Sequence, residues 1–159
     1  MLLTDYLKTG AEQHPDKLVL IHGARSFTYG EVHKAAMGIA AGLLDLGMEP
    51  GFRGALLNDD PFDYIASYFG ILLAGGVVVG LNTQTSGYSL AYVLNDCQAS
   101  VLFTAHKFVR HAEATLPGVA SLQVLVKSGA GENAQQDGKR CHTHSFSDLS
   151  EHPQPTESG

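Results

Sequence analysis

The sequence has little of what marks several classes of protein. Two cysteines, Cys97 and Cys141, are too few for a disulfide scaffold, so we expect a reducing, cytoplasmic compartment. No apolar run approaches the roughly 20 residues of a membrane-spanning helix. The segment Met1–Asp5 lacks the basic region and the apolar core of a secretory signal. The net charge is −6 without a basic cluster, which argues against a nucleic-acid partner.

The most informative stretch of the sequence runs from Gly51 to Asn82. A short apolar run over 55–57 is followed by Asp60 and Pro61, which suit the N-cap and the first helical position. Apolar residues then recur at helical spacing, at Phe62, Ile65, Ala66, Phe69, Leu72 and Leu73. Gly75-Gly76 ends this helix, and three valines follow as a strand. The stretch therefore predicts a right-handed, parallel βαβ unit.

Similar alternation extends to both sides of this unit. We expect earlier helices over 4–14 and from Thr28, where Thr28 and Glu31 have the spacing of a capping box. The other expected elements are a hairpin of strands 18–21 and 26–28, helices 86–96 and 105–115, and strands 100–104 and 122–126. The order predicts an α/β fold with a mostly parallel sheet, helices on both faces in a Rossmann-like three-layer arrangement, and an N-terminal hairpin.

The composition changes after the last expected strand. Residues 127–159 are rich in Ser, Gly, Gln, His and charged side chains, and only Phe146 and Leu149 look able to anchor them. We therefore divide the chain into an α/β subdomain over 1–126 and a polar region over 127–159. In that region we expect a surface loop over 127–144, and a linker or tail towards the end.

Four pieces of the chain, taken in order, resemble the N-terminal portion of the adenylate-forming superfamily, which includes AMP-forming acyl-CoA synthetases. They are Thr28-Tyr29-x-Glu31, Ala55-Leu56-Leu57-x-x-x-Pro61, Tyr68–Gly75 with Val77–Asn82, and Leu90–Asp96 with Val101–Thr104. The resemblance implies a parent enzyme that uses ATP, Mg²⁺ and CoA to activate a small-molecule carboxylic acid, such as a fatty acid. Such enzymes form an acyl-adenylate and then a thioester.

The resemblance also implies that this chain is a fragment. In the superfamily a Ser/Thr/Gly-rich loop that ends in lysine grips the ATP phosphates, and it should follow a segment like Ser145–Leu149. The sequence ends at Gly159 without such a loop, so we expect a structural piece with no catalytic residue and no cofactor of its own. Whether the isolated chain is an enzyme is left open, with inactivity expected.

Three polar residues are candidates for the edge of a binding cleft. Asn58, Asn82 and Thr104 each lie at the carboxyl end of an expected parallel strand, where open α/β sheets bind ligands. The alternative is ordinary turn and cap chemistry, because Asn and Thr side chains satisfy free backbone groups at such positions. We favour the second interpretation and assign none of the three to a cofactor.

Two further patterns contain residue types found in ligand sites. The glycines and lysine between Ser128 and Arg140 do not have the spacing of a phosphate-binding loop. Cys141, His142 and His144 are zinc-type ligands, but a closed site needs a fourth. We therefore expect no metal site.

One alternative function stays open. The chain could be a free-standing α/β binding or oligomerisation module without ligase activity, because an exposed apolar face favours self-association into a homo-oligomer.

Overall fold

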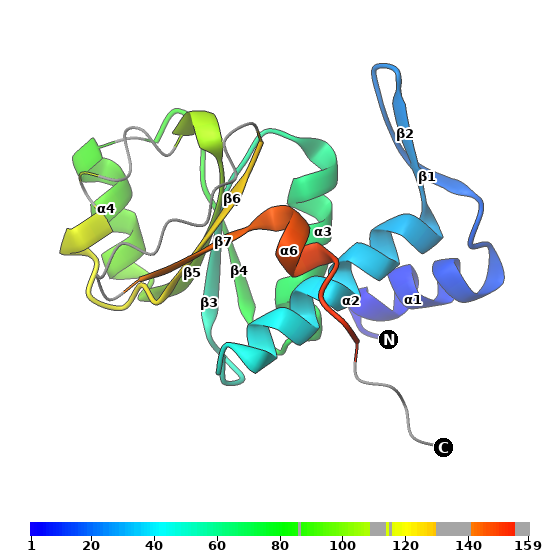
Figure 1. The fold of residues 1–159 in the computed structure, drawn as a ribbon, viewed down its shortest axis with the longest axis horizontal. Coiled ribbons are helices and arrows are strands. Elements are labelled where there is room, and N and C mark those ends of the chain that lie inside the picture. Colours follow the sequence, from blue (N-terminus) through cyan, green and yellow to red (C-terminus); the bar gives the residue numbers. More distant parts are fainter. Residues whose placement is uncertain (86, 109–113, 115, 130–140, 155–159) are drawn as a thin grey trace.

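The computed structural model describes residues 1–85, 87–108, 114, 116–129 and 141–154 (Figure 1). The elements that precede the sheet are α1 (Leu3–Gln13), β1 (Leu18–His22), β2 (Arg25–Thr28) and α2 (Tyr29–Asp45). The remaining elements are β3 (Arg53–Leu57), α3 (Pro61–Leu73), β4 (Val77–Gly80), α4 (Gly87–Asp96), β5 (Ala99–Ala105), η1 (Leu116–Gly118), β6 (Val124–Ser128), β7 (His142–Ser145) and α6 (Phe146–Ser150). Most of the helix expected over 105–115 lies outside the described residues.

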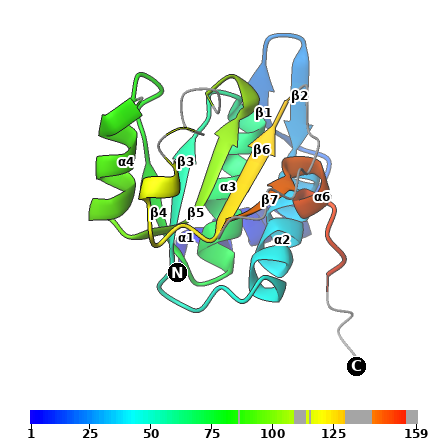
Figure 2. The same cartoon turned by 60° about the vertical axis from the view of Figure 1, so that its left-hand side comes forward.

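The main sheet has five strands in the order β4-β3-β5-β6-β7, and every neighbouring pair is parallel (Figure 2). Strands β1 and β2 pair antiparallel as a separate hairpin, which stands out from the body of the molecule in Figure 1. The predicted α/β class, the parallel sheet and the N-terminal hairpin are confirmed.

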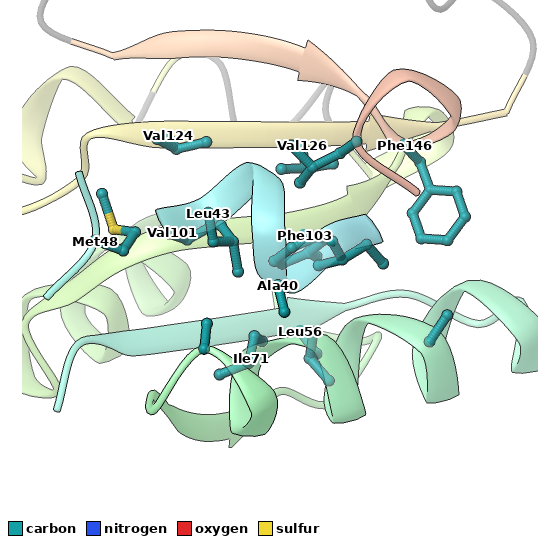
Figure 3. Close-up of a cluster of buried hydrophobic side chains, with 14 of the residues drawn as sticks. Ala40, Leu43, Met48, Leu56, Ile71, Val101, Phe103, Val124, Val126 and Phe146 are labelled. Carbon is teal, nitrogen blue, oxygen red and sulfur yellow. The ribbon is translucent and has the colours of Figure 1, made fainter. Parts of the chain in front are cut away.

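Each face of the sheet has its own apolar core, because successive residues of a strand point to opposite sides. Leu56, Phe103 and Val126 pack with helices α2, α3 and α6 in the cluster drawn in Figure 3. On the other face, Leu57 and Leu102 belong to a second cluster, to which α4 contributes Leu90 and Leu94. Helices therefore cover the sheet on both faces, as Figure 2 shows.

The start and stop signals in the sequence form as expected. The Asp60 carboxylate accepts hydrogen bonds from the backbone N–H groups of Phe62 and Asp63, with Pro61 in the first helical turn. Thr28 and Glu31 bond reciprocally as a capping box. Gly75 follows α3 with a φ of 80°, a conformation that favours glycine. In the described part of the chain, no helix has the length and apolar character that crossing a membrane requires.

The structure differs from the expected loop over 127–144 at both of its ends. Lys127 and Ser128 extend β6, and the polar segment His142–Ser145 is a fifth parallel strand beside it. Sequence patterns missed β7 because its backbone is held by pairing with β6, which needs no apolar alternation. Phe146 and Leu149 are buried, as expected of anchors. The division of the chain after residue 126 stays a prediction.

Candidate functional site

The buried polar residues of the protein gather at one end of the sheet. Of the five buried polar side chains in the described residues, four lie at the carboxyl ends of parallel strands: Asn58, Thr104, Ser128 and Ser145. This is the end at which open α/β sheets bind ligands. We refer to it as the carboxyl edge.

Asn58 links two strands that are not neighbours. Its side-chain amide donates to Ser128 Oγ over 3.0 Å, which joins the end of β3 to the end of β6 across β5. Its carbonyl oxygen accepts the backbone N–H of Asp60 over 2.8 Å, just before α3. The Asn58 side chain is only 7% exposed, so both hydrogen bonds replace solvent contacts that it has lost. The residue therefore orders the carboxyl edge.

The other two candidates lie at the same edge in different surroundings. Thr104 sits beside Leu57 in the sheet register, is buried, and donates from its hydroxyl to the Ala105 carbonyl over 3.3 Å. Asn82 follows β4, is exposed, and accepts the backbone N–H of Gln84 over 2.9 Å. Asn58 and Asn82 each accept a backbone N–H from two residues further on, as in a turn, whereas the Thr104 bond lies within β5. A ligand-binding role for them stays a prediction.

Two ion pairs flank α3 at this edge. Arg25 Nη1 of the hairpin lies 2.6 Å from Asp60 Oδ2, and Lys107 pairs with Asp59. Burial acts to raise the pKa of Asp60, but the bonds from Arg25 and from the α3 backbone outweigh it and hold that pKa below its ordinary value. The hydrogen bond to Asp60 raises the pKa of Arg25. Asp60 is therefore a charged cap, and both cations have partners.

We expect neither a phosphate-binding loop nor a metal site between Ser128 and His144, and only part of that segment is described in the structure. Gly129, at the end of β6, has a φ of 101°, whereas residues 130–140 lie outside the described part. Within the described ranges, no three His, Cys, Asp or Glu side chains come together as a metal-binding group.

A surface pocket of about 150 Å³ lies elsewhere, between α2, β7 and α6. Its lining residues are Gly42, Asp45, Leu46, His144, Asp148, Leu149 and His152. Asn58, Asn82 and Thr104 do not line it. The carboxyl edge is recognised by its buried polar side chains.

Sequence reasoning missed two members of the carboxyl edge. The sequence patterns place Ser128 in a possible phosphate loop and Ser145 in the Ser145–Leu149 segment of the family resemblance, and neither pattern assigns the residue to the carboxyl edge. Ser145 accepts the backbone N–H of Asp148 over 3.0 Å and caps α6. The available signals were a serine two residues after the apolar run Val124–Val126 and a serine directly before Phe146.

Comparison with known proteins places the chain in a family. A family model described as "AMP-binding enzyme" matches residues 7–158. The chain is 32% identical over 102 residues to a long-chain-fatty-acid–CoA ligase of Bacillus subtilis (strain 168), which covers 64% of this chain and 18% of that protein. It is 30% identical over 119 residues to a 4-hydroxybenzoate–CoA/benzoate–CoA ligase of Rhodopseudomonas palustris, which covers 75% of this chain and 22% of that protein.

The solved structures agree. The crystal structure of the anthranilate CoA ligase AuaEII in complex with anthranoyl-AMP superposes with a TM-score of 0.84 at 30% identity, over 96% of this chain and 28% of that one. The matched part of this chain thus spans 18%, 22% and 28% of these three proteins. With almost its whole length matched by the family model and by this structure, the chain belongs to the AMP-binding enzyme family.

Proposed function

We propose that residues 1–126 serve as one wall of the large lobe of an AMP-forming carboxylic acid–CoA ligase. The observation that carries the proposal is the family match over residues 7–158, combined with an α/β sheet whose carboxyl edge is polar and ordered. Asn58, Thr104 and Asn82 would form the floor of a cleft that a second lobe completes. The role of the chain is then architectural.

The parent reaction follows from the family. The carboxylate of the acid would attack the α-phosphate of ATP, with Mg²⁺, to form an acyl-adenylate and release pyrophosphate. The thiol of CoA would then displace AMP to give the thioester. A fatty acid is the substrate class that we favour, and a relative named as a long-chain-fatty-acid–CoA ligase supports it. Relatives named for benzoate and anthranilate make aryl acids the main competing class. We assign the reaction to the cytoplasm, as the cysteine content suggests.

The isolated chain should not catalyse this reaction. The side chains of the carboxyl edge bond to one another and to the backbone, which suits a scaffold better than an acid–base site. The test is acid-dependent exchange of pyrophosphate into ATP by the purified chain, with fatty and aryl acids in separate arms. A ligase that is active on the same acids is the positive control. No exchange is expected, and exchange with any acid would refute the scaffold role.

A hybrid protein tests the parent activity separately. Joined to the remaining lobe of a related ligase, the chain should support adenylate formation, and Asn58→Ala should reduce it. Failure of the folded hybrid with every acid would count against the ligase proposal, whatever the isolated chain does.

A second role, self-association, is favoured by apolar side chains on the surface. Ile21 on the hairpin is 70% exposed, and Tyr88 and Tyr92 on α4 are 84% and 61% exposed. Tyr88 and Tyr92 lie about one turn apart on α4, and exposed apolar side chains that lie together promote association. Sedimentation at several concentrations measures this directly, and a monomer at every concentration would exclude a homo-oligomer.

A further inference from the structure

The end of the described chain is closely fitted onto helix α2. A Cβ atom added at Gly38 would lie 2.1 Å from the backbone carbonyl oxygen of Ser150, and one added at Gly42 would lie 2.5 Å from Leu149 Cδ1. Two glycines one turn apart therefore let α6 approach closer than any side chain would allow. We call residues 142–152, comprising β7, α6 and the two residues after them, the clasp.

One polar contact ties the outer end of the clasp to the same helix. His152 Nε2 lies 2.7 Å from Asp45 Oδ2. The contact becomes a charge-assisted hydrogen bond when the imidazole is protonated.

A second histidine in the clasp has the opposite preference. His144 Nε2 is buried and finds no hydrogen-bond partner within the described residues, and the side chain lines the pocket shared with α2 and α6. A protonated imidazole carries a hydrogen on both ring nitrogens, so charging His144 in place would leave a buried N–H without an acceptor.

The structure places these two histidines in opposition. We propose that the clasp is a pH-sensitive latch, in which protonation of His144 favours release from α2 and the His152–Asp45 pair resists it. Release would uncover the apolar surface of α2 and the β6 edge. This inference concerns the fold of the chain and does not depend on the proposed ligase function.

The charged groups around His144 support the direction of the effect. Burial lowers the pKa of His144 most, the nearby His142 lowers it further, and Asp148 on α6 raises it without cancelling the other two. Asp45 and His152 line the same pocket from α2 and from the end of the clasp. On β6 the residue beside His144 is Val126, and the charged Lys127 is beside Ser145 instead.

These contacts determine the direction in which pH changes the stability of the docked clasp. The pKa of His144 is depressed in the docked clasp and returns to its ordinary value, about 6.5, in the released one. The released form therefore binds the proton more tightly. Docking is fully stable above that pH and weakens as the pH falls through it.

Hydrogen exchange of the full chain tests the latch. The probes are the N–H groups of Glu151 and His152, which bond to the carbonyls of Ser147 and Leu149 over 3.0 and 3.2 Å. Protection factors, corrected for the intrinsic pH dependence of exchange, should fall between pH 6.5 and 5.5. One linked proton limits the fall to about tenfold per pH unit. Amides of Val101 and Phe103 in β5 should keep their protection.

Three variants separate the two histidines. His144→Gln should abolish the fall with acid. Asp45→Asn should lower protection, because it removes the carboxylate that contacts His152. His33→Gln is the matched control, since His33 on α2 also has a pKa lowered by burial but does not line the pocket. It should behave as the wild type. A pH-independent wild type, an unchanged fall in His144→Gln, or loss of β5 protection together with α6 would overturn the latch.

Discussion

The two edge strands of the sheet are held in different ways. β4 is made of three valines and a glycine, and the helix that precedes it begins and ends at signals within the same 30-residue stretch. β7 reads His-Thr-His-Ser and pairs with β6, and the helix α6 that follows it fits against glycines more than 100 residues earlier on α2. Local signals specify one edge, and distant contacts specify the other. We therefore expect the first edge to share the global stability of the fold and the second to open separately.

The largest expected effect is on the β4 side. Ile71 of α3 is fully buried, and a Cβ added at Gly54 or Gly76 would lie 2.5 or 2.8 Å from its side chain. Ile71→Ala removes atoms that fill this space and should cost about 2–5 kcal/mol of unfolding free energy. Urea denaturation measures the loss. Leu44→Ala on α2, where the side chain is 50% exposed, is the control and should change stability by less than about 0.5 kcal/mol.

Hydrogen exchange of Ile71→Ala shows whether the β4 edge unfolds together with the rest of the sheet. If the β4 edge belongs to the global folding unit, Ile71→Ala shifts the protection of β5 and β3 together. A variant in which α3 and β4 alone lose protection would show that this edge also opens separately, and the contrast with the clasp would disappear.

The same contrast explains what could be predicted from the sequence. Asp60, Pro61 and Gly75 act through neighbours within three residues, so their patterns were sufficient for α3 and its limits. The hydrogen bond from Asn58 to Ser128 spans 70 residues and has no local pattern. The close contact at Gly38 also has no local pattern. A glycine within a helix indicates only low helix propensity until the segment that packs against it is known.

A smaller effect is expected where α6 meets α2. Gly38→Ala brings a methyl group against the backbone oxygen of Ser150, which cannot rotate away, so α6 must shift. We expect a cost of about 1–3 kcal/mol, confined to the clasp. Gly42→Ala is the matched variant, with the same gain in helix propensity but with the mobile end of Leu149 in its way. Hydrogen exchange of the α6 amides should show less protection in Gly38→Ala than in Gly42→Ala.

The difference in protection between Gly38→Ala and Gly42→Ala tests the backbone contact at Gly38. Equal protection in the two variants would mean that the backbone approach at Gly38 does not hold the clasp. A Gly38→Ala protein that is more stable than the wild type would mean that the gain in helix propensity outweighs the close contact with Ser150. That contact could then no longer account for the position of α6 and of the strand β7 before it.

The smallest effect is expected at the cap that opens α3. Asp60→Ala removes the acceptor for two backbone N–H groups and should cost about 1 kcal/mol near neutral pH. The partly exposed pair with Arg25 adds little to this, because solvent screens it. Asp59→Ala is the control, since Asp59 pairs with Lys107 and Asp60 is the cap of α3.

The pH dependence identifies the cap more securely than its size. The pKa of Asp60 is lower in the folded state than in the unfolded one, so its contribution is complete above the unfolded value, about 3.9, and is lost as the pH falls through the lower folded value. The stability difference between wild type and Asp60→Ala should therefore be constant from pH 7 to 5 and should shrink on further acidification. A difference that shrinks between pH 7 and 5 would point to a histidine instead, and would place the β4 side under the same kind of control as the clasp.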